Sequence, residues 1–98
     1  MIIKKLNNNG SLIKPPLSKQ IKSGLVILQP GQEVGEHMTD KREEIIVILE
    51  GVATIIVEGE TQSVGSNSIV YIPENKKHNI LNKGKKILRY VYIVCLRN

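Results

Sequence analysis

The chain has 98 residues, a net charge of +5 and 41% hydrophobic residues, which allows one globular domain with a modest core and excludes a disordered chain. No apolar run approaches the length of a membrane span, and the N-terminus lacks the apolar core of a signal peptide. The single cysteine, Cys95, excludes an internal disulfide. We therefore expect one cytoplasmic domain over residues 1–98 with no membrane partner.

The positive charge raises the question of nucleic-acid binding. The lysines are scattered, and the tight groups at 76–77 and 83–86 lie in turn-like sequence. Phe and Trp are absent and only three Tyr are present, so there are almost no aromatic side chains on which bases could stack. We expect solvated lysines and no nucleic-acid partner.

Short apolar segments separated by turn residues run along the whole chain. Branched apolar residues favour strands, and Pro30-Gly31 and Pro73 end two of them. No window shows the spacing of a helix. The candidate strands are residues 2–6, 11–13, 24–29, 34–38, 44–50, 52–58, 61–64, 68–72, 78–81 and 87–96.

The segment 44–50 is the most apolar of the central candidates. Its residues 45–49 do not alternate with polar ones, so we expect both faces of this strand to be covered. Gly51 makes a turn, and residues 52–58 are expected to return antiparallel to it. Many short strands in one small domain predict an all-β double-sheet jelly roll.

Three side chains could carry chemistry: His37, Glu44 and His78. Each histidine lies on a polar loop beside a predicted strand. Two imidazoles and one carboxylate are the ligand set of open mononuclear metal sites. Three protein ligands leave positions on the ion free for water or substrate.

The spacing of these residues resembles the motifs of the cupin family. Five residues separate Gly31 from His37, four separate Thr39 from Glu44, and six separate Glu44 from Gly51. The second motif of the family is matched over residues 67–82, with Asn67 and Asn75 at its two glycine positions, then Pro73, His78 and Asn82.

The resemblance covers about residues 24–96 and implies a double-stranded β-helix barrel, with residues 1–23 as N-terminal strands and loop. It implies that His37, Glu44 and His78 point inward and bind a divalent ion such as Fe, Mn, Zn, Ni or Co. Thr39 stands where the family has its second histidine, so the family's four ligands are reduced to three.

Glu43 competes with Glu44, since side chains alternate along a strand and only one of the two can face inward. With Glu44 inside, Ile46 and Ile48 line the interior, and with Glu43 inside the alternate residues do. Both sets are apolar, so periodicity does not decide. The six-residue distance to Gly51 in the family motif favours Glu44.

Other residues are candidates for lining a ligand pocket. Tyr90 and Tyr92 share one face of the last strand, and Arg89 lies on the other. A strand tyrosine is usually a packing residue with a hydrogen-bonded tip. Cys95 is expected to be a small buried residue. The pocket candidates are Thr39, Thr54, Tyr71, Tyr90 and Tyr92.

Two functions follow from these residues. The first is a metal-dependent enzyme of the isomerase or dioxygenase type that acts on a small polar metabolite. The second is a non-catalytic module that binds or senses a small ligand, with a degenerate or empty metal site. Because one barrel interior covers only one face of residues 45–49, we also expect a homodimer to which residues 2–13 contribute.

Overall fold

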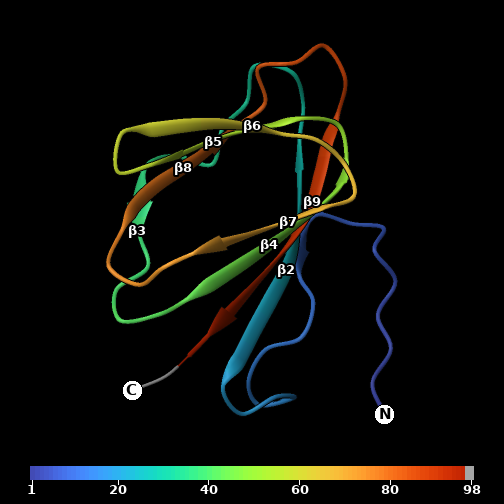
Figure 1. The fold of residues 1–98 in the computed structure, drawn as a ribbon. Helices are drawn as coiled ribbons and strands as arrows, with labels where there is room; N and C mark the ends of the chain where they lie inside the picture. The colour runs from blue at the N-terminus through green and yellow to red at the C-terminus, as the bar shows by residue number, and fades with distance from the viewer. Residues whose placement is uncertain (97–98) are drawn as a thin grey trace.

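The computed structural model describes residues 1–96, which form nine β-strands and no helix (Figure 1). The strands lie in two antiparallel sheets, and the predicted all-β jelly roll is confirmed. Residues 1–96 contain no helix able to cross a membrane. The strands are β1 (Gly10–Ser11), β2 (Ile21–Leu28), β3 (His37–Met38), β4 (Glu44–Glu50), β5 (Ala53–Val57), β6 (Glu60–Val64), β7 (Ser68–Ile72), β8 (Lys77–Leu81) and β9 (Leu88–Cys95).

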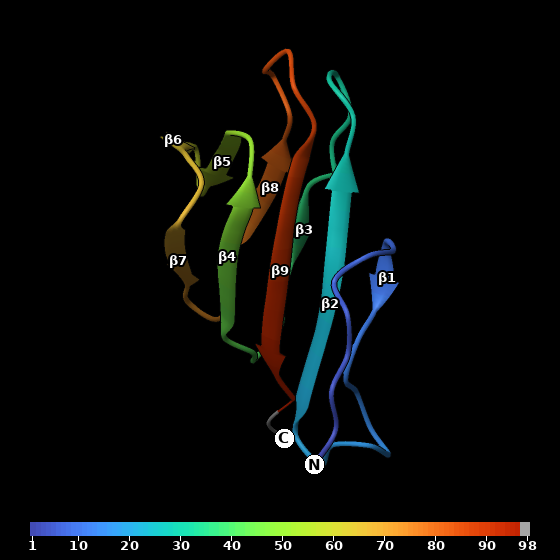
Figure 2. The same ribbon diagram turned by 90° about the vertical axis from the view of Figure 1, so that its right-hand side faces the viewer.

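The first sheet has the order β1-β2-β9-β4-β7 and the second the order β3-β8-β5-β6. Figure 2 shows the long strands β2, β9 and β4 of the first sheet side by side, with β8 and β5 behind them. Strand β3 is an edge of the second sheet, whereas β2 lies one strand in from the edge of the first, beside the two-residue β1. The candidate site lies between β2 and β3.

The core fills the space between the two sheets. Along β4, Ile46 and Ile48 are fully buried and alternate with outward residues. Leu88 and Tyr90 of β9 face the same interior, and Ile55 and Ile80 meet them from the second sheet. Alternation of this kind is what a sheet with one buried face requires.

The N-terminal region differs from the sequence prediction. Residues 2–6 form no strand, and of residues 11–13 only Ser11 belongs to one, the two-residue β1. The segment instead runs along β2 as irregular chain, where Leu12 N–H donates to the Ser23 carbonyl and Ile27 N–H to Asn9 Oδ1 (Figure 2). Isolated contacts of this kind fix a segment without making a ladder.

The predicted pairing of the segments 44–50 and 52–58 was wrong. β4 pairs with β9 on one side and β7 on the other, so neither of its edges is free for β5. β5 lies in the opposite sheet between β6 and β8. Gly51, at φ 85°, carries the chain across the sandwich, and a Cβ there would collide with the Ile87 carbonyl oxygen.

Candidate metal centre

The two histidines of the chain lie opposite each other on neighbouring strands. In the short antiparallel pair of β3 and β8, His37 is the register partner of His78. Their ring centroids are 4.1 Å apart with an interplanar angle of 62°. Both therefore project from the same face of the second sheet, although 40 residues separate them in sequence.

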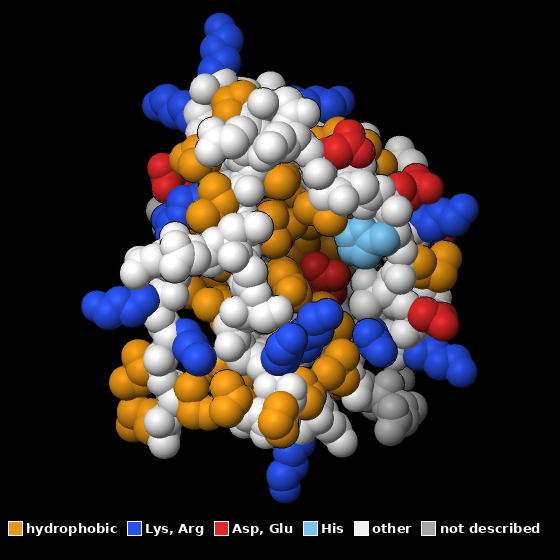
Figure 3. Space-filling view, turned by 180° about the vertical axis from the view of Figure 1, so that it is seen from behind, with side chains coloured by type: hydrophobic (Ala, Val, Ile, Leu, Met, Phe, Trp, Pro, Cys, Tyr) orange, Lys and Arg blue, Asp and Glu red, His pale blue; other side chains and the backbone are white. Residues whose placement is uncertain are grey.

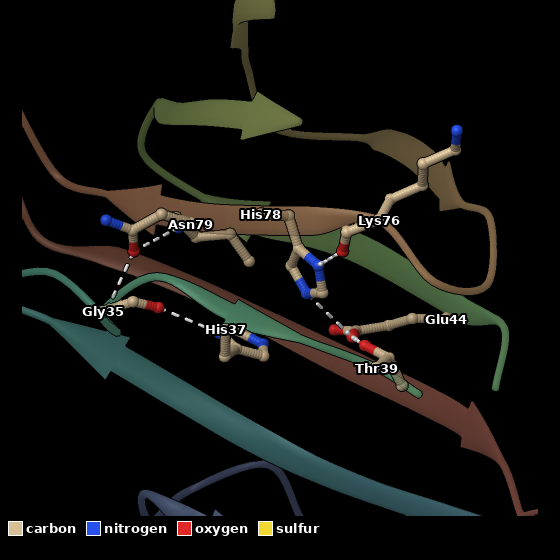
Figure 4. A network of polar contacts seen from close by, with 8 residues as sticks. Gly35, His37, Thr39, Glu44, Lys76, His78 and Asn79 are labelled. Carbon is tan, nitrogen blue, oxygen red and sulfur yellow. Dashed lines mark hydrogen bonds and ion pairs between the residues drawn. The ribbon is translucent and has the colours of Figure 1, made fainter. Parts of the chain in front are cut away.

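The third side chain comes from the first sheet. Glu44, the first residue of β4, is 6% exposed and points between the sheets. Its Oε1 lies 3.4 Å from His78 Nε2 (Figure 4). Glu43 points outward and accepts a hydrogen bond of 2.6 Å from the Tyr71 hydroxyl. The structure thus places Glu44, and not Glu43, beside the histidines.

Backbone carbonyls fix which ring nitrogen of each histidine faces the site. His37 Nδ1 lies 2.9 Å from the Gly35 carbonyl and His78 Nδ1 lies 3.0 Å from the Lys76 carbonyl. A carbonyl can only accept, so each Nδ1 donates its hydrogen, and in the neutral imidazole each Nε2 carries a lone pair. This arrangement orients imidazoles that bind metal ions.

His78 Nε2 is the most informative atom of the site. It is fully buried and makes no hydrogen bond of good geometry within residues 1–96, and its one polar neighbour is Glu44 Oε1, in an ion-pair contact at 3.4 Å. A buried polar atom without a good hydrogen bond is costly, and its presence in a well-packed protein needs an explanation. A metal ion that accepts the lone pair is such an explanation.

The spacing of the three groups fits that reading. One ligand atom from each of His37, Glu44 and His78 lies within 4.8 Å of the others. Two atoms that bind one ion at about 2.1 Å lie at most about 4.2 Å apart, so small side-chain rotations would suffice. Nitrogen and carboxylate donors suit the borderline divalent transition metals.

Burial and the neighbouring polar groups shift the pKa of His78 in opposite directions. Burial lowers the pKa of His78, but the Glu44 carboxylate and the Lys76 carbonyl outweigh it and raise the pKa above the usual range. The pKa of Tyr90 is also raised, by burial first and by the nearby Glu44 charge second. Tyr90 therefore stays a neutral phenol beside the site.

A cavity of about 450 Å³ opens from this site to the solvent between β2 and β3. His37 and Glu44 line it, and the buried His78 lies behind them. Figure 3 shows an acidic side chain recessed at the bottom of a hollow, with histidine beside it and basic side chains at the rim. The remaining lining residues are Lys22, Val26, Val34, Met38, Thr39, Asp40, Arg42, Ile80, Tyr90, Tyr92 and Val94.

The structure separates the predicted pocket residues into two groups. Thr39, Tyr90 and Tyr92 line the cavity, and the Thr39 hydroxyl lies 3.4 Å from Glu44 Oε1. Tyr71 and Thr54 do not line it. Tyr71 is exposed on the outer side of β7, and Thr54 alternates with the inward residues of β5.

Two further side chains matter that the sequence analysis did not single out. Asn79 Oδ1 accepts the Gly35 N–H at 2.9 Å, and Gly35 in turn holds His37 (Figure 4). Lys22 lies on the inward face of β2. The strand predicted from the sequence began only at residue 24, so the inward position of Lys22 could not be read from it.

Known proteins resemble this chain in both sequence and fold. The family model of the cupin domain matches residues 24–94. A polyketide synthase CurC of Streptomyces cyaneus is 30% identical over 69 residues, 70% of this chain and 45% of that protein. The chain thus spans less than half of that curated relative.

Solved structures agree on the fold. The cupin domain of Schizosaccharomyces pombe Cnp3 superposes with a TM-score of 0.83 at 21% identity, over 91% of this chain and 64% of that one. A predicted oxalate decarboxylase of Thermotoga maritima gives 0.74 at 24% identity, over 78% and 66%. With a family model that matches most of its length and a double-sheet barrel to go with it, the chain belongs to the cupin family.

Proposed function

We propose that this cupin holds one divalent transition-metal ion and acts on a small polar metabolite as an isomerase- or dioxygenase-type enzyme. His37 and His78 would provide imidazole Nε2 ligands, and Glu44 would provide a carboxylate oxygen. The observation that carries the proposal is the convergence of one ligand atom from each of these three residues within 4.8 Å, around a buried His78 Nε2 that has only a 3.4 Å contact with Glu44 Oε1.

When bound, such an ion supplies Lewis-acid activation of an oxygen ligand or a position at which dioxygen can react. The chain's own residues do the rest. Glu44 offsets part of the ion's charge, and the Gly35 and Lys76 carbonyls hold the two rings in the tautomer that leaves Nε2 free. The apolar side chains of Val26, Val94 and Ile80 narrow the cavity around the site.

The cavity size supports a small substrate. Its volume of about 450 Å³ lies toward the low end of small-molecule sites and is too small for a polymer. A Thermotoga maritima protein of the same fold is described as a predicted oxalate decarboxylase, which supports a small polar molecule as the substrate.

Elemental analysis of protein purified without added metal tests the proposal. The wild type should carry close to one transition-metal ion per chain, and Glu44→Gln and His78→Ala should lose it. Glu43→Gln is the matched control, since that carboxylate is adjacent in sequence but bonds Tyr71 outside the barrel. Equal trace metal in all four proteins would refute the metal site.

A non-catalytic ligand-binding role is the second candidate, and Thr39 favours it. The threonine offers no fourth nitrogen donor and points its hydroxyl toward Glu44 instead. A chain that binds a small ligand in the cavity while free of metal would support this second role.

We further propose that two copies associate through the outer face of β9, β4 and β7. Ile45 of β4 lies opposite both Tyr71 and Ile93, and these side chains are 37%, 56% and 37% exposed. With Ile69, which is 69% exposed, they form an apolar patch on one side of the sheet. Residues 2–13, which carry the exposed Ile2 and Ile3 and bond to β2 through Leu12 and Ile13, would contribute to this association.

A further inference from the structure

We infer that the cavity takes a small dicarboxylate, with one carboxylate held by Lys22 and the other directed at the His37, Glu44 and His78 site. The inference deepens the proposed function and rests on it, because it assigns the substrate class of that same site.

Lys22 occupies the same row of the first sheet as Glu44. Lys22 is the register partner of Val94, and Val94 is the partner of Glu44. Side chains that are directly opposite across antiparallel strands lie on the same face, so Lys22 and Glu44 both point between the sheets. Val94 alone stands between them.

The separation in this row sets the size of the ligand. Two interstrand spacings put the backbones of Lys22 and Glu44 about 10 Å apart. Both side chains extend into the cavity, and Lys22 is long and flexible. A molecule of a few carbons with an oxygen group at each end can therefore bridge from the lysine ammonium to the metal site.

Tyr92 provides a second polar group in the cavity, in addition to Lys22. A Cβ on Gly24 would lie 2.5 Å from the Tyr92 hydroxyl, so this ring lies directly over Gly24 of β2. Gly24 is next to Lys22 on the inward face. The Tyr92 hydroxyl therefore lies in the floor of the cavity, where it can donate a hydrogen bond to a carboxylate.

The charges of the cavity favour an anion once a metal ion is present. The cations Lys22 and Arg42 cancel the carboxylates Asp40 and Glu44, and a bound divalent ion then leaves an excess of two positive charges. Charges act more strongly in a partly desolvated cavity than in bulk water. A dianion restores neutrality, and a neutral ligand does not.

Within residues 1–96, Lys22 and Arg42 form no ion pair with a carboxylate, and Lys22 as a residue is half-buried. An ammonium that enters the cavity gives up part of its hydration. A ligand carboxylate would compensate for that loss.

Calorimetric titration of the metal-loaded protein tests the inference. The probes are malonate, succinate and glutarate, with succinamide as the neutral analogue of the same shape. At least one dicarboxylate should bind more tightly than succinamide. Lys22→Met should weaken that binding about tenfold or more, because it keeps the apolar stem and removes the charge. Lys19→Met, at an exposed position outside the cavity, is the matched control.

The outcomes separate the two proposals. If metal is bound but no dicarboxylate exceeds succinamide, or if Lys22→Met binds as well as the control, the inference is overturned and the metal site stands. If the wild type retains no metal in elemental analysis, the proposed function fails first and the inference fails with it. Loss of dicarboxylate binding in Lys22→Met, with metal content and succinamide binding unchanged, supports the inference.

Discussion

His37 and His78 face each other as register partners across β3 and β8, and their Nδ1 atoms are both bound to carbonyls two residues earlier in the chain. The same local device therefore orients both imidazoles. No side chain is needed to define the tautomer, because the backbone carbonyls of Gly35 and Lys76 do so. The segment before His37 is irregular, so the Gly35 carbonyl that orients His37 needs a further contact to hold it in place.

Asn79 supplies that support, and its removal should weaken metal binding. Asn79 Oδ1 holds the Gly35 N–H, and Asn79 Nδ2 donates to Glu33 Oε1 at 3.0 Å. Without these bonds the Gly35 carbonyl is less well placed for His37. We expect Asn79→Ala to lower metal affinity about 10- to 100-fold, the usual effect of removing such a partner.

Competition titration with a chelating dye measures this affinity. Asn9→Ala is the control, because it removes a side-chain bond of the same kind, to the Ile27 N–H, far from the site. If both variants keep the wild-type affinity, Asn79 has no role in orienting His37.

The raised pKa of His78 predicts opposite pH trends for the metal-free and metal-loaded protein. In the metal-free protein, the folded state binds the proton more tightly than the unfolded chain, so this contribution is complete below about pH 6.5 and is lost as pH rises through the raised pKa. Metal binding needs the neutral imidazole and so strengthens with pH over the same range.

The rise in melting temperature on adding metal should therefore be larger at about pH 8 than at about pH 6. Thermal denaturation with and without one equivalent of metal measures it. His78→Ala, which lacks one of the proposed ligands, should show no metal-induced rise at either pH. A metal-induced shift that is equal at both pH values would contradict the prediction.

The family resemblance identified the second motif although both of its glycines are missing, and the backbone explains why. Asn67 has φ 62° and Asn75 has φ 61°, so both adopt the left-handed conformation that glycine favours. Asparagine is among the few other residues that adopt it at modest cost. The turn geometry is thus retained with a different side chain, although a comparison of residue types alone shows a mismatch with the family motif.

A substitution series at Asn67 tests this account. Its backbone N–H donates to the Ile48 carbonyl, a bond that any residue except proline can make. Asn67→Gly should change the free energy of unfolding by less than about 0.5 kcal/mol, whereas Asn67→Val should cost about 1–2 kcal/mol for the left-handed backbone. Urea denaturation measures both, and equal stability of the glycine and valine variants would contradict the account.

Other features could not be derived from the sequence, because they depend on which strands meet. The sequence around Gly51 resembles a hairpin and indicates a turn. It does not show that β4 already pairs with β7 and β9, so the predicted pairing with β5 was wrong. The choice between Glu43 and Glu44 was similarly open. Residues 45–49 are apolar on both faces, and only the outer patch explains why.

That outer patch predicts a dimer that a single charge should disrupt. Ile45 is near its centre, opposite Tyr71 and Ile93, and two-fold association would bring each patch against its copy. We expect Ile45→Glu to shift the protein to monomer in sedimentation equilibrium. Val52→Glu is the control, since Val52 is 48% exposed outside the patch. A wild type that is monomeric at all concentrations, or equal dissociation by both variants, would rule out this interface.

Asn82 should be the polar residue on which the stability of the site-bearing half most depends. It is 1% exposed, and its amide nitrogen donates to the carbonyls of Leu28 and Lys86 at 2.9 and 2.8 Å while its oxygen accepts the Gly84 N–H. Its main chain also binds Gly31 and Gln32, where the loop to His37 begins.

Asn82→Ala leaves the groups that bond the Asn82 side chain without partners. We expect the free energy of unfolding, measured by urea denaturation, to fall by about 3 kcal/mol. Asn82→Asp should be at least as harmful, because a carboxylate cannot donate to two carbonyls. A loss below about 1 kcal/mol in both variants would show that water or rearranged backbone replaces the amide.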